Sequence, residues 1–151
     1  MTNAFPESVA LVYRMPDGPY DAEGLFVDPL DPALYIVTKD RDQAFVFRGS
    51  LESTGTTQDM ELVATLFLGE EVSGADITSD GQIIAFRGYD TVWMWNRLAG
   101  QSVGEALSTE PCTAPSPEER QGESIAFDDQ WGYYTISEGT APDINHVPSG
   151  R

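Results

Sequence analysis

The chain has 151 residues, of which 25 are acidic and eight are basic, so its formal net charge at pH 7 is −17. This charge argues against nucleic acids and anionic membrane surfaces as partners, because phosphate binding needs clustered cations. No apolar run approaches the roughly 20 residues that a membrane span needs, and the N-terminal sequence lacks the basic and apolar regions of a signal peptide. We therefore expect a soluble, unexported protein in the cytoplasm.

Short runs rich in valine, isoleucine and aromatic residues alternate with clusters of glycine, proline, aspartate and serine. Their period is two residues, which is typical of strands, and no window of a dozen residues carries a helical stripe. The predicted strands, in chain order, lie at 9–15, 21–29, 34–39, 44–49, 61–69, 73–80, 83–88, 91–96, 101–108, 121–129, 133–139 and 143–147. The sequence therefore predicts an all-β fold.

Three segments of the chain align as internal repeats: DAEGLFVDP from Asp21, SGADITSD from Ser73 and QGESIAFDD from Gln121. Each is followed by a turn and a second strand. The spacing of about 50 residues is that of the four-stranded blades of a β-propeller. We expect blade one at about 21–69, blade two at about 73–110 and blade three at about 121–148.

The ends of the chain predict how the blades close. Blade three has only three predicted strands, while the strand at 9–15 precedes blade one at the spacing of an outer strand. Three blades are too few for a ring, since propellers have about four to eight. Two copies would give six blades, so the sequence predicts a homodimer through exchange of the N-terminal strands. A fragment of a longer propeller and a twelve-stranded sandwich are the alternatives.

The motifs DAEGLFVDP, GADITSDGQIIAFRGYD and QGESIAF resemble those of uncharacterised bacterial six-bladed propeller proteins, which are distantly similar to phytase-like and lactonase-like propellers. The resemblance spans residues 9–147 and implies a propeller fold. Such relatives usually carry all their blades in one chain, whereas this chain carries half.

In a propeller the first strands line the central channel, and the loops that enter them share a face with the loops that leave the second strands. We expect one channel mouth there. The candidate residues are Asp21, Glu23, Lys39, Asp40, Asp76, Arg87, Tyr89, Asp90, Glu123 and Glu138.

Glu23 and Glu123 are predicted to be equivalent in blades one and three, with Gly74 at that position in blade two. Carboxylates that converge on a channel can share a hard cation such as Ca²⁺ or Mg²⁺. The alternative is that they pair with Lys39 and Arg87, which are predicted to close equivalent second strands. The same two basic side chains could instead bind a small anionic ligand.

Three further positions carry reactive or aromatic side chains. His146 is predicted at an edge or subunit contact, and Cys112 is predicted to be an inert loop thiol. Trp93 and Trp95 are expected to pack between blades.

Two hypotheses about function follow. The first is a ligand-binding or protein-interaction scaffold with an acidic, polar mouth, and no cofactor is required for it. The second is a calcium-assisted hydrolase of a lactone or phosphate ester, in which Glu23 or Glu123 acts as base.

Overall fold

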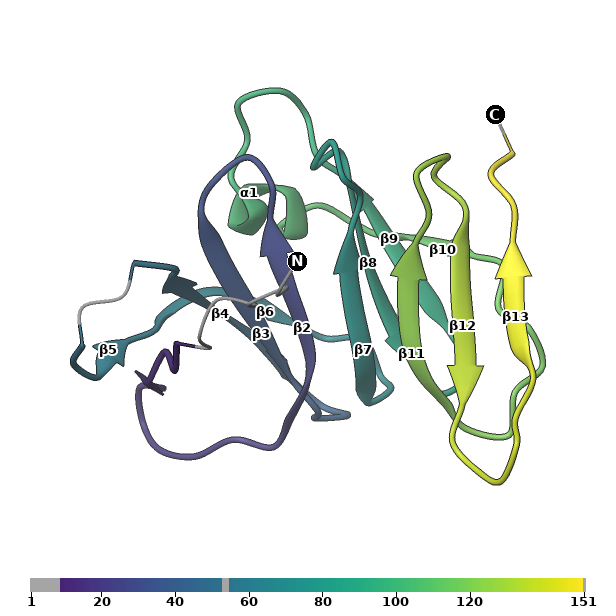
Figure 1. The fold of residues 1–151 in the computed structure, drawn as a ribbon, viewed down its shortest axis with the longest axis horizontal. Coiled ribbons are helices and arrows are strands. Elements are labelled where there is room, and N and C mark those ends of the chain that lie inside the picture. The colour runs from purple at the N-terminus through teal and green to yellow at the C-terminus, as the bar shows by residue number, and fades with distance from the viewer. Residues whose placement is uncertain (1–8, 53–54, 151) are drawn as a thin grey trace, which may run out of the picture.

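Three antiparallel sheets stand side by side in chain order in the computed structural model, which describes residues 9–52 and 55–150 (Figure 1). We refer to these sheets as blades one, two and three. The fold is all-β, as the period-two pattern predicts. The start of the N-terminal sequence used above to assess a signal peptide lies outside the described residues.

Blade one has four strands in the order β2-β3-β4-β6, each antiparallel to its neighbour. The strands are β2 (Ala22–Asp28), β3 (Ala33–Thr38), β4 (Ala44–Ser50) and β6 (Glu61–Leu66). Residues on β2 alternate between exposed and buried, because one face of the sheet packs on blade two.

Blade two also has four strands, in the order β7-β8-β9-β10. They are β7 (Val72–Ile77), β8 (Ile83–Gly88), β9 (Val92–Asn96) and β10 (Cys112–Ala114). Five of the six residues of β8 are buried, the exception being Ile83, because blades one and three cover both faces of this sheet.

The prediction of a strand at 101–108 is wrong. Residues 103–107 within that range form a short helix, α1 (Val103–Leu107). The fourth strand of blade two is β10, which begins at Cys112, so the predicted loop at Cys112 is also wrong. Ser102 caps the helix: its hydroxyl accepts from the Glu105 N–H, and the Glu105 carboxylate accepts from the Ser102 N–H. Three buried side chains of one helical turn then pack on the core, namely Val103, Ala106 and Leu107.

Blade three has three strands among the described residues, β11 (Gly122–Phe127), β12 (Tyr133–Ser137) and β13 (Ile144–Val147). The N-terminal strand β1 (Tyr13–Arg14) pairs in parallel with β5 (Gln58–Asp59), within the connection between β4 and β6. A single chain does not test the predicted pairing of residues 9–15 beside blade three of another copy.

Apolar side chains fill the spaces between the blades. Phe26 stacks on Tyr35 in blade one, and Phe86 packs on Trp95 in blade two; the ring centroids are 5.0 Å apart in each pair. Both pairs belong to the buried cluster between these two blades. Trp93 belongs to the same buried cluster, so both tryptophans occupy the inter-blade position that the sequence predicts.

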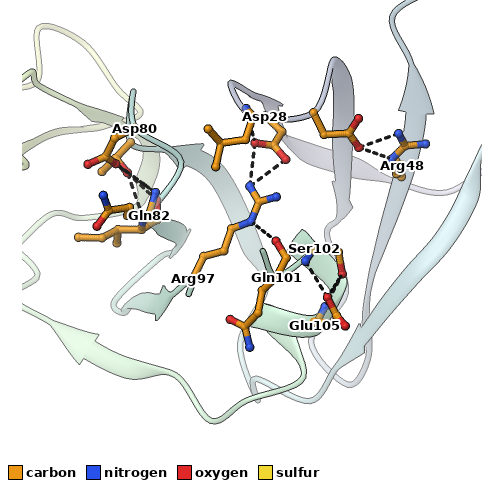
Figure 2. Close-up of polar contacts among 12 residues, drawn as sticks. Asp28, Arg48, Asp80, Gln82, Arg97, Gln101, Ser102 and Glu105 are labelled. Carbon is orange, nitrogen blue, oxygen red and sulfur yellow. Dashed lines mark hydrogen bonds and ion pairs between the residues drawn. The ribbon is translucent and has the colours of Figure 1, made fainter. Parts of the chain in front are cut away.

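A buried ion pair also joins blades one and two. The Arg97 guanidinium, beyond β9, donates to both carboxylate oxygens of Asp28 at the end of β2, at 2.8 and 2.9 Å (Figure 2). Arg97 also donates through Nε to the Gln101 carbonyl, which connects the residues just before α1 to this ion pair.

Candidate ligand-binding mouth

The loops that enter the first strands and those that leave the second strands form one rim, at the lower end of β7 and β11 in Figure 1. The Lys39 N–H donates to the Asp21 carbonyl at 2.8 Å, and the Glu138 N–H donates to the Gln121 carbonyl at 3.0 Å. The Gly122 N–H reaches the Tyr89 carbonyl at 3.4 Å, which links the rims of blades two and three.

A register shift recurs at the start of all three first strands. In blade one it lies between Ala22 and Gly24, in blade two between Val72 and Gly74, and in blade three between Gly122 and Ser124. Such a β-bulge leaves one residue unpaired and redirects its side chain.

The unpaired residues of the three bulges are Glu23, Ser73 and Glu123. The equivalent of the two glutamates in blade two is therefore Ser73, and the predicted equivalence with Gly74 is wrong. The Ser73 hydroxyl donates to the carbonyls of Gly122 at 2.7 Å and Arg87 at 3.2 Å. It ties blade two to blade three.

Lys39 and Glu23 form an ion pair at the mouth, with 3.0 Å between Nζ and Oε1. The ammonium also lies 5.3 Å from the centroid of the Tyr89 ring, so the pair bridges the rims of blades one and two. The contact with Tyr89, followed by the hydrogen bond to Glu23, raises the pKa of Lys39 above its ordinary value. Lys39 is therefore a fixed cation at neutral pH.

The first strands β2, β7 and β11 line a hollow of about 290 Å³. Glu23, Asp76 and Glu123 contribute its carboxylates, one from each blade. Glu123 accepts a hydrogen bond from the Gln121 side-chain amide at 2.9 Å. The hollow lies where the sequence predicts the channel mouth.

Asp76 is half-buried in this hollow, and its Oδ2 accepts from the Phe127 N–H at 2.7 Å. Burial raises the pKa of Asp76, although backbone hydrogen bonds from Phe127 and Ile77 act in the opposite direction. This carboxylate links the first strands of blades two and three while one side of it faces the hollow.

Arg87 does not reach the mouth. In the strand register it is equivalent to Val37 and Ile136, which lie inside β3 and β12, so the predicted equivalence with Lys39 is wrong. Tyr89 occupies the position equivalent to Lys39, and Glu138 occupies it in blade three. The side chain of Arg87 points between blades two and three and is fully buried.

A buried network surrounds Arg87. Its guanidinium donates to Glu119 at 3.2 Å and to the Tyr89 carbonyl at 3.1 Å, and also to the Ser116 hydroxyl. Glu119 in turn accepts from Asn145 at 2.8 Å and from the Thr135 hydroxyl. The network joins blade two, the loop before β11 and blade three.

Sequence reasoning missed Glu119, because it lies in an irregular proline-containing stretch with neither strand periodicity nor a recognisable motif. A lone carboxylate in a loop gives no sequence signal of burial. Its partner is 32 positions away in the chain, and only the packing of the blades brings the two together.

The remaining predicted mouth residues are exposed. Asp21 and Glu138 lie on the rim, and Glu138 faces a shallow depression between its own loop and the loop that contains Glu118. Of the two bases predicted at the mouth, only Lys39 lies there, and it is paired with Glu23. The expectation of a small anionic ligand therefore loses one of the two bases on which it depended.

Among the described residues, no group of three or more histidine, cysteine, aspartate or glutamate side chains is arranged to hold a metal ion. Glu23 and Glu123 each have a nearby partner, Lys39 for the first and Gln121 for the second. A metal shared with carboxylates of another copy stays a prediction that a single chain does not test.

His146 lies on β13, at the end of blade three opposite the mouth. Its Nε2 is 2.9 Å from Asp128 Oδ2, and its ring stacks on Tyr134 with 4.4 Å between centroids. The contact with His146 is the largest cause of a lowered pKa at Asp128. Cys112 is exposed on β10, and its thiol donates to the Met94 carbonyl.

In the part of the chain that the structure describes, no helix is both long enough and apolar enough to cross a bilayer.

No family model matches the sequence, and no curated protein matches it. Solved structures do match the fold. A hydrazine synthase from Kuenenia stuttgartiensis matches with a TM-score of 0.56 and 12% identity over 84% of this chain and 34% of that chain. A luciferin-regenerating enzyme matches with a TM-score of 0.55 and 12% identity, over 86% of this chain and 45% of that chain.

Both structures are propeller-type folds, so the likeness shows a propeller-like fold for this chain. At 12% identity it carries no information about activity. The chain spans between a third and a half of the length of these structures.

Proposed function

We propose that the chain is half of a six-bladed propeller and that it acts as a binding scaffold. A second copy closes the ring, and the ligand binds at the mouth of the central channel. The observation that carries this proposal is the hollow between β2, β7 and β11, into which each blade contributes a carboxylate. Closure by a second copy would place two such hollows around one channel.

The character of the mouth favours recognition over catalysis. Glu23, Asp76 and Glu123 have contacts that hold their positions, as expected for a preorganised binding surface. The predicted calcium-assisted hydrolase would need a carboxylate that acts as base beside the cation, and Glu23 and Glu123 already accept hydrogen bonds from Lys39 and Gln121. No contact at the described mouth favours the alternative of a calcium-assisted hydrolase.

The test uses Ca²⁺ and inorganic phosphate as probes, one for each sign of charge. Isothermal titration and thermal unfolding are measured for the wild type and for the Glu23→Gln/Glu123→Gln double variant. If the carboxylates bind a cation at the mouth, Ca²⁺ raises the melting temperature of the wild type, and the double variant loses at least about nine-tenths of that increase. Glu61→Gln, on the outer strand β6, is the matched control and should respond as the wild type does.

Phosphate tests the opposite ligand. If Lys39 binds anions, phosphate binding should disappear in Lys39→Gln and persist in Glu61→Gln. If Ca²⁺ and phosphate leave both the heat of titration and the melting temperature unchanged, the mouth carboxylates and Lys39 make only their contacts within the chain. A mouth that binds small ions would then be refuted.

A further inference from the structure

The two inter-blade contacts within the chain show what a complete contact looks like, and each outer blade has one face that lacks it. We propose that the open face of blade three docks against the open face of blade one of a second copy, and that β1 of that copy becomes its fourth strand. This inference rests on the proposed ring, and it specifies the surfaces that close it.

The open face of blade one lies on its first strand. Leu25 and Val27 on β2 are 60% and 48% exposed. Their register equivalents are Ala75 and Ile77 in blade two, 8% and 7% exposed, and Ile125 in blade three, 5% exposed. Phe127, the equivalent of Val27 in blade three, is intermediate in exposure. The equivalents of Leu25 are therefore buried wherever a preceding blade is present, and those of Val27 are at least partly covered.

The open face of blade three shows the same contrast on its opposite side. Tyr134 and Ile144 are 44% and 69% exposed. The register equivalents of Tyr134 are Tyr35 and Ala85, and those of Ile144 are Val46 and Val92. All four equivalents are at most 2% exposed, because the next blade covers them.

The first strands of neighbouring blades approach closely because the side that faces the next blade carries a glycine. A Cβ atom on Gly24 would lie 3.1 Å from the Ala75 Cβ, and one on Gly74 would lie 3.2 Å from the Ser124 Cα. The third position of this series is Ser124. It would therefore face Leu25 of the second copy, where a small side chain meets a large one.

Ala126 continues this match, because it follows Ser124 on the same side of β11 and is also exposed. Val27 follows Leu25 on the same side of β2. Two small side chains on one face and two larger ones on the other are complementary in size, as well-packed interfaces require.

Strand β1 already occupies the place of an outer strand. The outer strand β6 of blade one packs Ala64 and Leu66 against blade two, and β10 packs Ala114 against blade three. In the same manner β1 packs Tyr13, together with Met15, against the face of blade one that has no preceding blade.

The contact of Tyr13 with blade one is specific. Its hydroxyl donates to the Ser50 carbonyl at 2.5 Å, and its ring covers Gly49, where a Cβ atom would lie 2.7 Å from the ring. A side chain on residue 49 would displace the ring, so glycine is needed there for this close approach. β1 is thus an outer strand whose other three strands are absent from the described chain.

Blade three supplies the complementary gap. Among the described residues, no strand pairs with the outer edge of β13. The outer strands β6 and β10 are each antiparallel to the third strand of their blade. β1 of the second copy would accordingly pair antiparallel with β13, and the contact with β5 on its other edge could remain.

Part of the charge at this contact is already paired. His146 and Asp128 on blade three lie 2.9 Å apart, and Glu23 on blade one pairs with Lys39. The charge of −17 on each chain acts at longer range and repels the two copies. Dimerisation should therefore strengthen as salt screens this repulsion.

The first experiment measures the mass in solution by light scattering at 0.3 M NaCl. The wild type should have twice the chain mass of 16.5 kDa. Leu25→Asp and Ile144→Asp, one on each open face, should weaken the dimer at least about 100-fold, because each would bury a charge without a partner. Leu98→Asp is the control, since Leu98 is 68% exposed in the loop between β9 and α1 and belongs to neither open face. Circular dichroism confirms that each variant is folded.

The second experiment tests the register of docking by disulfide formation in a Cys112→Ser background. The Leu25→Cys/Ser124→Cys double variant should form a covalent dimer on oxidation, because residue 124 of one copy faces residue 25 of the other. Leu98→Cys/Ser124→Cys should form none.

The outcomes separate the claims. A monomeric wild type that stays monomeric from 0.05 to 1 M NaCl would overturn both the docking and the closed ring. A wild-type dimer that survives Leu25→Asp and Ile144→Asp, or that gives no 25–124 disulfide, would overturn the docking alone and leave binding at the mouth to the Ca²⁺ and phosphate titrations.

Discussion

The buried pair of Arg87 and Glu119 gives the sharpest test of what attaches blade three to blade two. Their side chains are 0% and 3% exposed, and Glu119 also accepts from Asn145 and Thr135. Glu119→Gln keeps the shape of the side chain but removes its negative charge. It also replaces one hydrogen-bond-accepting oxygen with an amide NH₂ group, which donates. The Arg87 guanidinium then remains charged and buried with only neutral acceptors.

The size of the effect follows from that burial. Removing one partner of a buried ion pair costs about 3–5 kcal/mol, most of it from the uncompensated charge that remains. Among the described residues, Arg87 has no second carboxylate within reach, and its Nε has no hydrogen-bond partner. Because the urea dependence of unfolding is about 1–3 kcal/mol per molar for small proteins, we expect the unfolding midpoint to fall by roughly 2 M.

The assay is urea unfolding followed by tryptophan fluorescence, with all variants at the same protein concentration, because the apparent stability of a dimer depends on concentration. Asp59→Asn is the control, because it removes the Arg14–Asp59 pair, whose two side chains are both 69% exposed. Such a surface pair contributes about 0–1 kcal/mol. If Glu119→Gln and Asp59→Asn lower the midpoint equally, the buried pair does not hold the blades together and the reasoning fails.

Three further predictions concern single contacts. Asp76 has a raised pKa in the folded chain, so its charged form opposes folding. Asp76→Asn should therefore raise the free energy of unfolding at pH 7. This gain in stability over the wild type should disappear as the pH falls through the raised pKa. A lower melting temperature at pH 7 would contradict it. His146→Ala should raise the pKa of Asp128 in an NMR titration, since the contact with His146 is the largest cause of its lowered value; an unchanged pKa would show that the backbone hydrogen bonds suffice. Ser102→Ala should cost about 1 kcal/mol in urea unfolding through loss of the helix cap, whereas the exposed Ser79→Ala should cost almost nothing.

Local pattern was sufficient for most of the strands. Where a segment such as 83–88 is apolar and bounded by turn residues, period and boundaries together specify a strand, and the structure has one there. The repeat of about 50 residues likewise predicts the three sheets, because each unit carries the same strand and turn signals. The segment at 101–108 fails because its apolar residues suit either element, and the Ser102–Glu105 capping box favours the helix.

The candidate site was predictable only in part, since it depends on register. The sequence by itself places Lys39, Glu23 and Tyr89 near the loops of one rim, because strand order alone determines which ends share a face. A β-bulge of one residue decides that Ser73, and not Gly74, matches the two glutamates, and that Arg87 points between blades. A shift of one residue in the pairing of two strands moves a side chain to the other face of the sheet, and no local sequence pattern indicates such a shift.

What the sequence determined is the all-β class, the three repeated units and a surplus of carboxylates on the chain, because each of these is a property of short segments or of composition. Only the tertiary structure decided that Arg87 pairs with Glu119, that Asp28 pairs with Arg97, and that Leu25 and Ile144 remain exposed while their equivalents are buried. These facts depend on contacts between residues far apart in the chain. Such contacts are set by how the blades pack, which no single segment encodes.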